Sequence, residues 1–132
     1  MSGITFLALS EVLEIHAEQT SLFGGNNGIR DMKLLESALT MPQAGIDGVY
    51  FHPDVFSKAA AYLFHIIQNH PFVDGNKRTG LACAYLFLSL NGIELECDPG
   101  ELTEMVLAAA RGGMNKEEIA GFLKCHAITM SE

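Results

Sequence analysis

Two long apolar segments, residues 55–67 and 81–90, constrain the fold of this 132-residue chain more than any other feature. In the first, apolar side chains recur at helical spacing and form a stripe wide enough for a buried helix. The second is apolar nearly all round, which predicts the central helix of a domain. The first stops near Asn69 and the second at Asn91-Gly92, a typical helix C-terminus. We therefore expect a helical core that is built on these two segments.

The N-terminal third predicts two shorter helices. Ser10 is a candidate N-cap for the first, which the glycine-rich turn at 24–28 ends. Asp31 is a candidate cap for the second, which ends at Pro42. Residues 43–52 have no helical period and predict a loop or a short hairpin. This region therefore adds helices to the core and one exposed connection.

The remaining segments complete the expected fold. Pro53 suits the first turn of the first core helix. After the second core helix, a short extended piece at 93–97 leads to helices over about 100–111 and 115–125. The chain has no internal repeat and no linker to a second domain. We expect a single all-α domain over residues 1–132, with about six helices around a central buried helix.

The charge balance limits the classes of partner. Sixteen acidic residues against eight basic ones give a formal net charge of −8. A nucleic-acid binder normally carries a basic surface, and an anionic membrane attracts basic segments, so we expect neither partner. A phosphate-bearing ligand must therefore be held by a local group of donors.

The cysteines and the hydropathy pattern indicate a cellular compartment. The chain has three cysteines and no CxxC pair, which favours free thiols in a reducing cytoplasm. The N-terminus has no basic region before its apolar stretch, unlike a signal peptide. No apolar run reaches membrane-spanning length. We expect a cytoplasmic protein.

One short stretch carries the features of an anion site. Lys77-Arg78 is the only pair of adjacent basic residues, and it follows Gly75-Asn76 where the second core helix begins. Cations are misplaced at a helix start, because the N–H groups there are unpaired and the dipole is positive. A bound phosphate reverses that conflict. Gly75 allows a close backbone approach, and Asn76 can cap the helix or donate to phosphate. The alternative is a surface turn with solvated charges.

The residues before this pair favour the phosphate interpretation. A carboxylate at Asp74 would repel phosphate unless a divalent cation such as Mg²⁺ lay between them, although Asp74 could instead cap the helix. His70 precedes Pro71 at a turn and is a candidate general base, although a single histidine is more often structural. Phe72 is expected to anchor the loop in the core. Together these residues predict a phosphate-transfer site.

Other polar residues give weaker signals. His65 and His70 are five positions apart and do not share a helix face, and sequence spacing reveals no cluster of metal ligands. We expect Lys116 and Lys124 to be solvated. The carboxylates between residues 94 and 104 are expected to contribute solubility.

The stretch His70 to Gly80 resembles the Fic/Doc motif, H-x-F-x-D/E-G/A-N-G/K-R, and its GNKRTG variant is similar to the death-on-curing toxin branch of that family. The resemblance extends to Gly28-Ile29-Arg30-Asp31, to His52-Pro53, and over essentially the whole chain. It implies a Fic fold that binds ATP and Mg²⁺. The implied roles are a catalytic base for His70, a metal carboxylate for Asp74 and phosphate binders for Asn76, Lys77 and Arg78. The loop at about 43–52 would be the flap that aligns the target segment.

Two departures from the adenylyltransferases of this family matter. Those enzymes commonly have Gly where this chain has Lys77, and a second Arg where it has Leu81. The resemblance therefore implies transfer of the ATP γ-phosphate to a threonine of elongation factor Tu, which halts translation. AMP transfer to a protein hydroxyl is the alternative, and a non-catalytic relic that only binds is a third hypothesis.

The resemblance also implies an antitoxin. Fic proteins can carry an inhibitory S/T-x-x-x-E-G/N helix in the same chain, but the nearest match, Ser10 to Ile15, lacks the final Gly or Asn. A separate small antitoxin protein is therefore the expected partner.

Overall fold

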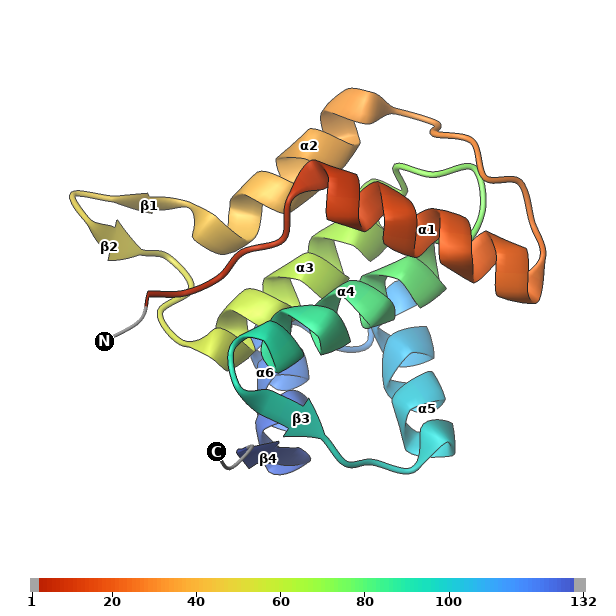
Figure 1. Cartoon of the computed structure of the whole chain (residues 1–132). Helices are drawn as coiled ribbons and strands as arrows, with labels where there is room; N and C mark the ends of the chain where they lie inside the picture. Colours follow the sequence, from red (N-terminus) through yellow and green to blue (C-terminus); the bar gives the residue numbers. More distant parts are fainter. Residues whose placement is uncertain (1–2, 130–132) are drawn as a thin grey trace.

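The structure is a computed structural model that describes residues 3–129. Within this range the chain forms six α-helices and two short antiparallel strand pairs (Figure 1). The helices are α1 (Leu9–Phe23), α2 (Met32–Thr40), α3 (Val55–Asn69), α4 (Asn76–Leu90), α5 (Pro99–Ala110) and α6 (Lys116–Cys125). The strands are β1 (Gly45–Ile46), β2 (Val49–Tyr50), β3 (Ile93–Leu95) and β4 (Ala127–Thr129), and a 3-10 turn, η1 (Met41–Gln43), extends α2. The expected mainly helical fold is confirmed.

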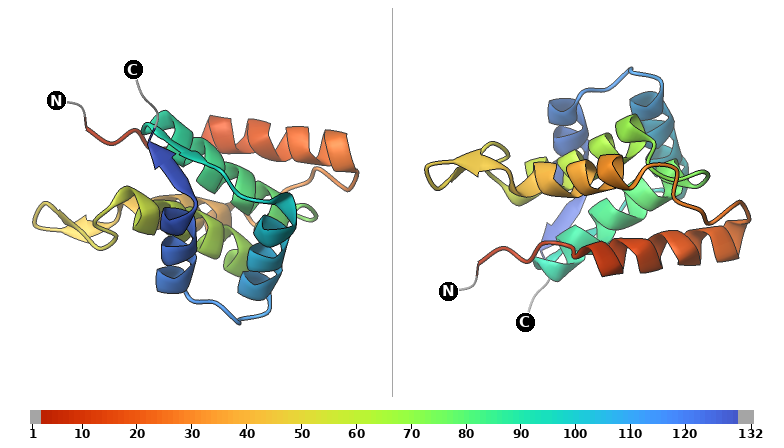
Figure 2. Two further views of the ribbon diagram at one scale, coloured as in Figure 1. Left: turned by 90° about the horizontal axis from the view of Figure 1, so that it is seen from below. Right: turned by 90° about the horizontal axis from the view of Figure 1, so that it is seen from above.

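The helices α3 and α4 lie side by side at the centre of the molecule (Figures 1 and 2). Helix α3 packs against α2, α4, α5 and α6, while α4 also contacts α1 and β3. We expected α4 to be the central helix, but α3 is the more enclosed of the two, because Tyr85 and Leu90 of α4 are exposed. The largest apolar side chains of the core come from both helices and include Tyr62, Leu63, Ile66, Phe87 and Leu88.

The N-caps of α1, α2 and α3 test the helix starts predicted from the sequence. Asp31 caps α2, and its carboxylate accepts a hydrogen bond from the backbone N–H of Leu34 at 3.0 Å, as predicted. The prediction for Ser10 was wrong, because α1 begins after Ala8, whose N–H donates to a Glu11 carboxylate oxygen at 2.7 Å. The N-cap of α3 is Asp54, so Pro53 lies outside the helix and not in its first turn.

The predicted hairpin at 43–52 is present as β1–β2, but it does not lie beside the 70–76 loop. It projects from the N-terminal end of α3, whereas the loop follows the C-terminal end (Figure 1). A helix of 15 residues is about 22 Å long. The expectation that this hairpin aligns a target at His70 was therefore wrong. Residues 24–31 run alongside the loop instead, with an isolated β-bridge between Ile29 and Phe72.

The C-terminal part closes the fold below α3 and α4. Strands β3 and β4 pair in antiparallel register, with Leu95 opposite Ala127, and thereby join the end of α6 to the segment that leads into α5. The three cysteines are free thiols. Among residues 3–129, none of the helices combines the length and the apolar character needed to cross a membrane.

Candidate functional site

His70 stands at the point where α3 ends and the loop begins. It is the C-cap of α3 and adopts a left-handed conformation, with φ 50° and ψ 53°. Left-handed backbone is uncommon outside glycine, and Pro71 disfavours helical geometry in the residue before it. The chain therefore turns sharply at His70, whose side chain is exposed to solvent.

Arg30 holds this turn in place, and sequence reasoning gave it no such role. Its Nε donates to the carbonyl of His70 at 2.6 Å, and a terminal nitrogen donates to the carbonyl of Asn69 at 2.9 Å. The last carbonyls of a helix lack partners and carry the negative end of its dipole, so a guanidinium there is favourable. The backbone N–H groups of Arg30 and Asp31 also donate to the carbonyl of Pro71. Arg30 thus fixes the backbone from which the His70 side chain projects.

Phe72 is the buried residue of the loop, with no exposed surface. The ring of His16 on α1 stacks on it, with centroids 3.7 Å apart and planes 8° from parallel. The side-chain amide of Asn76 binds both backbone groups of Phe72, each at 3.0 Å. Asn76 is itself buried, so its amide oxygen and one amide hydrogen brace the loop and are not directed at a ligand.

Asp74 presents its carboxylate at the surface. One oxygen accepts a hydrogen bond from the backbone N–H of Asn26 at 2.8 Å. The carbonyl of Asp74 accepts a hydrogen bond from Nε2 of His16 at 2.7 Å, which requires the hydrogen of that ring to be on Nε2. The N-cap of α4 is Gly75 and has no side-chain cap bond. Asp74 therefore does not cap the helix, and neither of its carboxylate oxygens bonds to the first turn of α4.

Gly75 adopts φ 80° and ψ 18°, a left-handed conformation that favours glycine. The chain can therefore enter α4 directly, and it places Lys77 and Arg78 in the first turn of the helix, where both are exposed. The guanidinium of Arg78 lies over the ring of Phe23, 4.6 Å from its centroid. The two cations thus stand at the positive end of the α4 dipole, as expected from the sequence.

A cleft of about 330 Å³ opens beside these cations. One wall is the start of α4, from Gly75 to Arg78, with Leu81 in the next turn; the other wall belongs to α5. Thr103, Val106 and Leu107 form that second wall. His70 and Asp74 do not line the cleft but lie in the loop before it. The structure therefore brings Lys77 and Arg78 to a cleft, uses the side chain of Asn76 to brace the loop, and places the predicted base and metal carboxylate in the loop before the cleft.

A second group of histidines and lysines joins the segment before α3, α3 itself and the start of α6. Nζ of Lys116 lies 3.1 Å from Nε2 of His52 and 3.0 Å from Nε2 of His65. Nζ of Lys58, which is buried, donates to the carbonyl of His52 at 2.6 Å and lies 3.9 Å from the ring centroid of Tyr50. We expected Lys116 to be solvated, but it joins α6 to α3. We call His52, Lys58, His65 and Lys116 the basic cluster.

Burial and mutual repulsion disfavour the charged forms in the basic cluster. Burial, followed by the charges of Lys116 and His52, lowers the pKa of His65 to about 4. Burial and Lys116 likewise lower the pKa of His52, and burial lowers the pKa of Lys116. The neutral imidazoles of His52 and His65 both accept from the ammonium group of Lys116. We therefore interpret the basic cluster as a structural contact between α3, α6 and the segment before α3.

A family model and two known proteins match this chain. The model of the Fic/DOC family matches residues 6–88, which include the whole loop and α4 up to Leu88. "Toxin Doc" of Mycolicibacterium smegmatis is 47% identical over 76 residues, which is 58% of this chain and 58% of that protein. "Protein kinase doc" of Escherichia phage P1 is 32% identical over 114 residues, which is 86% of this chain and 89% of that protein.

Proposed function

Because the chain belongs to the Fic/DOC family, we propose that it is a toxin that transfers the γ-phosphate of ATP to a protein hydroxyl. The proposed target is a threonine of a translation factor similar to elongation factor Tu, and its modification halts translation. One observation carries the proposal. Lys77 and Arg78 stand exposed at the start of α4, on a cleft that lies one short loop from His70.

The start of α4 supplies the phosphate site. The first N–H groups of a helix have no partners within it, and the dipole adds positive potential. Lys77 and Arg78 add two cations at the same place. Phosphate oxygens in the cleft then accept charge-assisted hydrogen bonds from both, which offsets the electrostatic cost of cations at a helix start.

The residues before α4 fit a divalent cation such as Mg²⁺. Asp74 is an exposed carboxylate, and a backbone N–H holds one of its oxygens and thereby orients the other. Magnesium is commonly held by one or two carboxylates together with substrate phosphate oxygens. When bound, such an ion neutralises phosphate charge; in this proposal Asp74 is its protein ligand.

His70 is the proposed base. The hydroxyl oxygen of the target forms a bond to the γ-phosphorus, the bond from that phosphorus to the β–γ bridging oxygen breaks, and ADP leaves with the electron pair. The hydroxyl proton goes to the imidazole of His70. The hydrogen bonds from Arg30 to the carbonyls of Asn69 and His70 keep the ring at the loop entrance.

Leu81 favours phosphate transfer over AMP transfer. Adenylyltransferases of this family commonly have an arginine at this position, whereas the cleft of this chain has the apolar side chain of Leu81 there. Lys77 lines the same cleft at the position where those enzymes commonly have glycine. The chain therefore provides one arginine and one lysine for the phosphates.

We further propose that the protein acts in the cytoplasm and is controlled by a separate antitoxin protein. The support for an antitoxin is the similarity to a relative named a toxin. Affinity purification of the protein from its native cells tests it: a separate small protein should co-purify, and co-expression of that protein should restore growth.

The central experiment uses two forms of labelled ATP. The full-length protein is incubated with elongation factor Tu, Mg²⁺ and ATP labelled at either the γ- or the α-phosphate. Label from the γ-position alone supports phosphate transfer, and label from the α-position supports AMP transfer. No label from either form, while nucleotide still binds, contradicts both activities on this target.

A further inference from the structure

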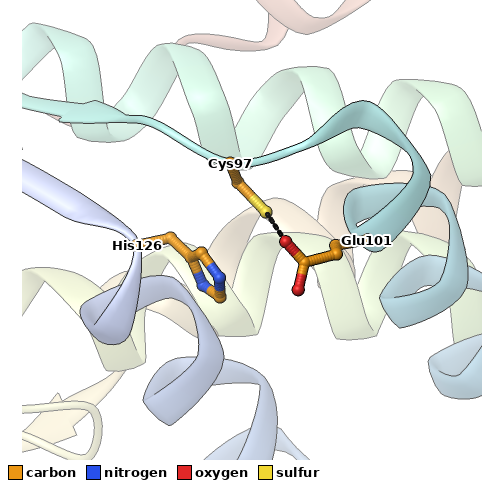
Figure 3. A group of neighbouring side chains, drawn as sticks. All are labelled: Cys97, Glu101 and His126. Atoms are coloured by element: carbon orange, nitrogen blue, oxygen red, sulfur yellow. Dashed lines mark hydrogen bonds between the residues drawn. The ribbon is translucent and has the colours of Figure 1, made fainter.

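Three side chains that sequence spacing did not connect converge at the C-terminal part of the fold. Cys97 follows β3, Glu101 lies in the first turn of α5, and His126 is the C-cap of α6 (Figure 3). The three point toward one another, and their potential ligand atoms all lie within 4.8 Å of one another. A thiol, a carboxylate and an imidazole from three segments thus share one small volume.

The ring of His126 is already oriented as a metal ligand. Its Nδ1 lies 2.8 Å from the carbonyl of Phe122. A carbonyl only accepts, so Nδ1 carries the hydrogen, and Nε2 of the neutral ring keeps its lone pair for an ion. Histidines that bind metals almost always donate their other ring nitrogen in this way.

The backbone around the other two residues is fixed as well. The N–H of Glu96 donates to the carbonyl of His126 at 2.8 Å, which extends the β3–β4 pairing and holds the residues beside it. Asp98 is the N-cap of α5, and its carboxylate accepts from the N–H of Gly100 at 3.0 Å. The connection from Cys97 to Glu101 is therefore ordered by local hydrogen bonds, and the Cys97 sulfur lies 3.5 Å from the carbonyl oxygen of Asp98.

The sulfur of Cys97 lies 3.9 Å from a Glu101 carboxylate oxygen, a weak contact at most. A divalent cation between the two would bind the sulfur and the carboxylate at a common centre.

We propose that Cys97, Glu101 and His126 bind a zinc-class divalent cation. The mixed sulfur, nitrogen and oxygen donors match zinc, whereas Mg²⁺ and Ca²⁺ take oxygen ligands. Bond lengths of about 2.0–2.3 Å in a tetrahedral site place ligand atoms roughly 3.3–3.8 Å apart. The observed group needs only rotamer adjustments of about 1 Å to reach that spacing. Three protein ligands leave a fourth position for water, since the group is only partly buried.

The ion would connect the β3–β4 strand pair to the cleft between α4 and α5. Glu101 is on α5, and Thr103 on the same helix lines the cleft. Binding therefore tethers the start of α5 to β3 and to the end of α6. The site is separate from Asp74 in both position and ion preference, so it stands whether or not the proposed phosphate transfer is correct.

Cobalt(II) titration of the full chain tests the proposal, because a cobalt–thiolate bond gives a charge-transfer absorption band. We expect this band to saturate at one equivalent of Co²⁺ and to be removed by added Zn²⁺. Cys97→Ser should abolish it. Glu101→Gln and His126→Gln should weaken binding by more than the roughly 10- to 100-fold that loss of an outer-shell partner costs.

Cys125→Ser is the matched control, because Cys125 is an exposed cysteine of the same region outside the group. This variant should bind cobalt like the parent. Zinc should raise the melting temperature of the parent and of Cys125→Ser, but not that of Cys97→Ser, and circular dichroism of each variant checks that it folds. The proposal is wrong if folded parent protein gives no thiolate band, or if the band survives in Cys97→Ser.

Discussion

The basic cluster and the loop after α3 carry similar residues in opposite settings. The basic cluster is turned inward, and its Lys58 and Lys116 bind carbonyl and imidazole acceptors. After the C-terminal end of α3, His70, Lys77 and Arg78 face solvent beside a cleft. The side chains that brace the loop there are those of Arg30 and Asn76. Histidine and lysine content alone therefore does not locate a site. The site is where such groups remain available after the fold has satisfied its own polar atoms.

The largest expected difference between the loop and the basic cluster concerns His70 and His65. Asparagine tolerates the left-handed backbone of His70, so His70→Asn removes the base without the strain that alanine would add. We expect phosphate transfer to fall by about 10²–10⁴-fold, with a change in unfolding free energy below about 0.5 kcal/mol. Single-turnover assays and urea denaturation measure the two quantities.

His65→Asn is the matched variant in the basic cluster. It should leave transfer unchanged and reduce stability, because Lys116 loses an acceptor. Equal loss of transfer in both variants would remove the distinction between the loop and the basic cluster.

Lys58→Ala tests the structural role of the basic cluster. The side chain is fully buried, so its loss leaves a cavity and an unpaired carbonyl at His52. We expect a loss of about 2–4 kcal/mol in the free energy of unfolding, with unchanged activity per folded molecule. Lys124→Ala, an exposed lysine on α6, should have little effect. A Lys58→Ala protein as stable as the parent would show that the cluster is not a structural contact.

Lys77→Ala tests the phosphate site, and Lys33→Ala is its matched control. Each lysine is the exposed second residue of its helix, α4 and α2 respectively. Loss of one charge-assisted contact should weaken ATP binding about tenfold for Lys77→Ala, and not for Lys33→Ala. Calorimetry measures both affinities. Equal ATP affinity in the two variants would show that Lys77 is a solvated surface charge that does not bind the phosphates.

The pH dependence of stability gives the smallest expected effect. His65 has a pKa of about 4 in the fold and an ordinary value of 6.5, so the unfolded chain binds its proton more readily. The free energy of unfolding is therefore highest above about pH 6.5, where His65 is neutral in both states, and it falls as the pH is lowered toward 4. Because the ring is half-exposed, we expect a loss of about 1 kcal/mol. His65→Gln should flatten this part of the urea-midpoint profile; an unchanged profile would show that His65 titrates normally.

Sequence alone predicted the features that depend on neighbouring residues. Local rules predicted the cap at Asp31, the hairpin, and the helix ends near Asn69 and Asn91. The family resemblance also came from contiguous residues, and it is confirmed. Local reasoning failed at Ser10, because Glu11 reaches back to the backbone and makes a capping side chain unnecessary.

Sequence could not predict contacts between distant segments. Arg30 donates hydrogen bonds to the end of α3, about 40 positions further along the chain. The ring of His16 on α1 stacks on Phe72 in the loop after α3. Lys116 lies 51 positions from His65, so its burial depends on how α6 packs on α3. The same is true of the group at Cys97, whose three members come together only when β3 pairs with β4.

The most direct test of the proposed activity is the intact mass of the target protein. Elongation factor Tu is incubated with Mg²⁺-ATP and either the parent protein or His70→Asn, and each sample is analysed by mass spectrometry. We predict a gain of one phosphate group with the parent and no gain with His70→Asn at the same time point. A gain of AMP, or an equal gain of phosphate with both proteins, would contradict the proposed γ-phosphate transfer with His70 as its base.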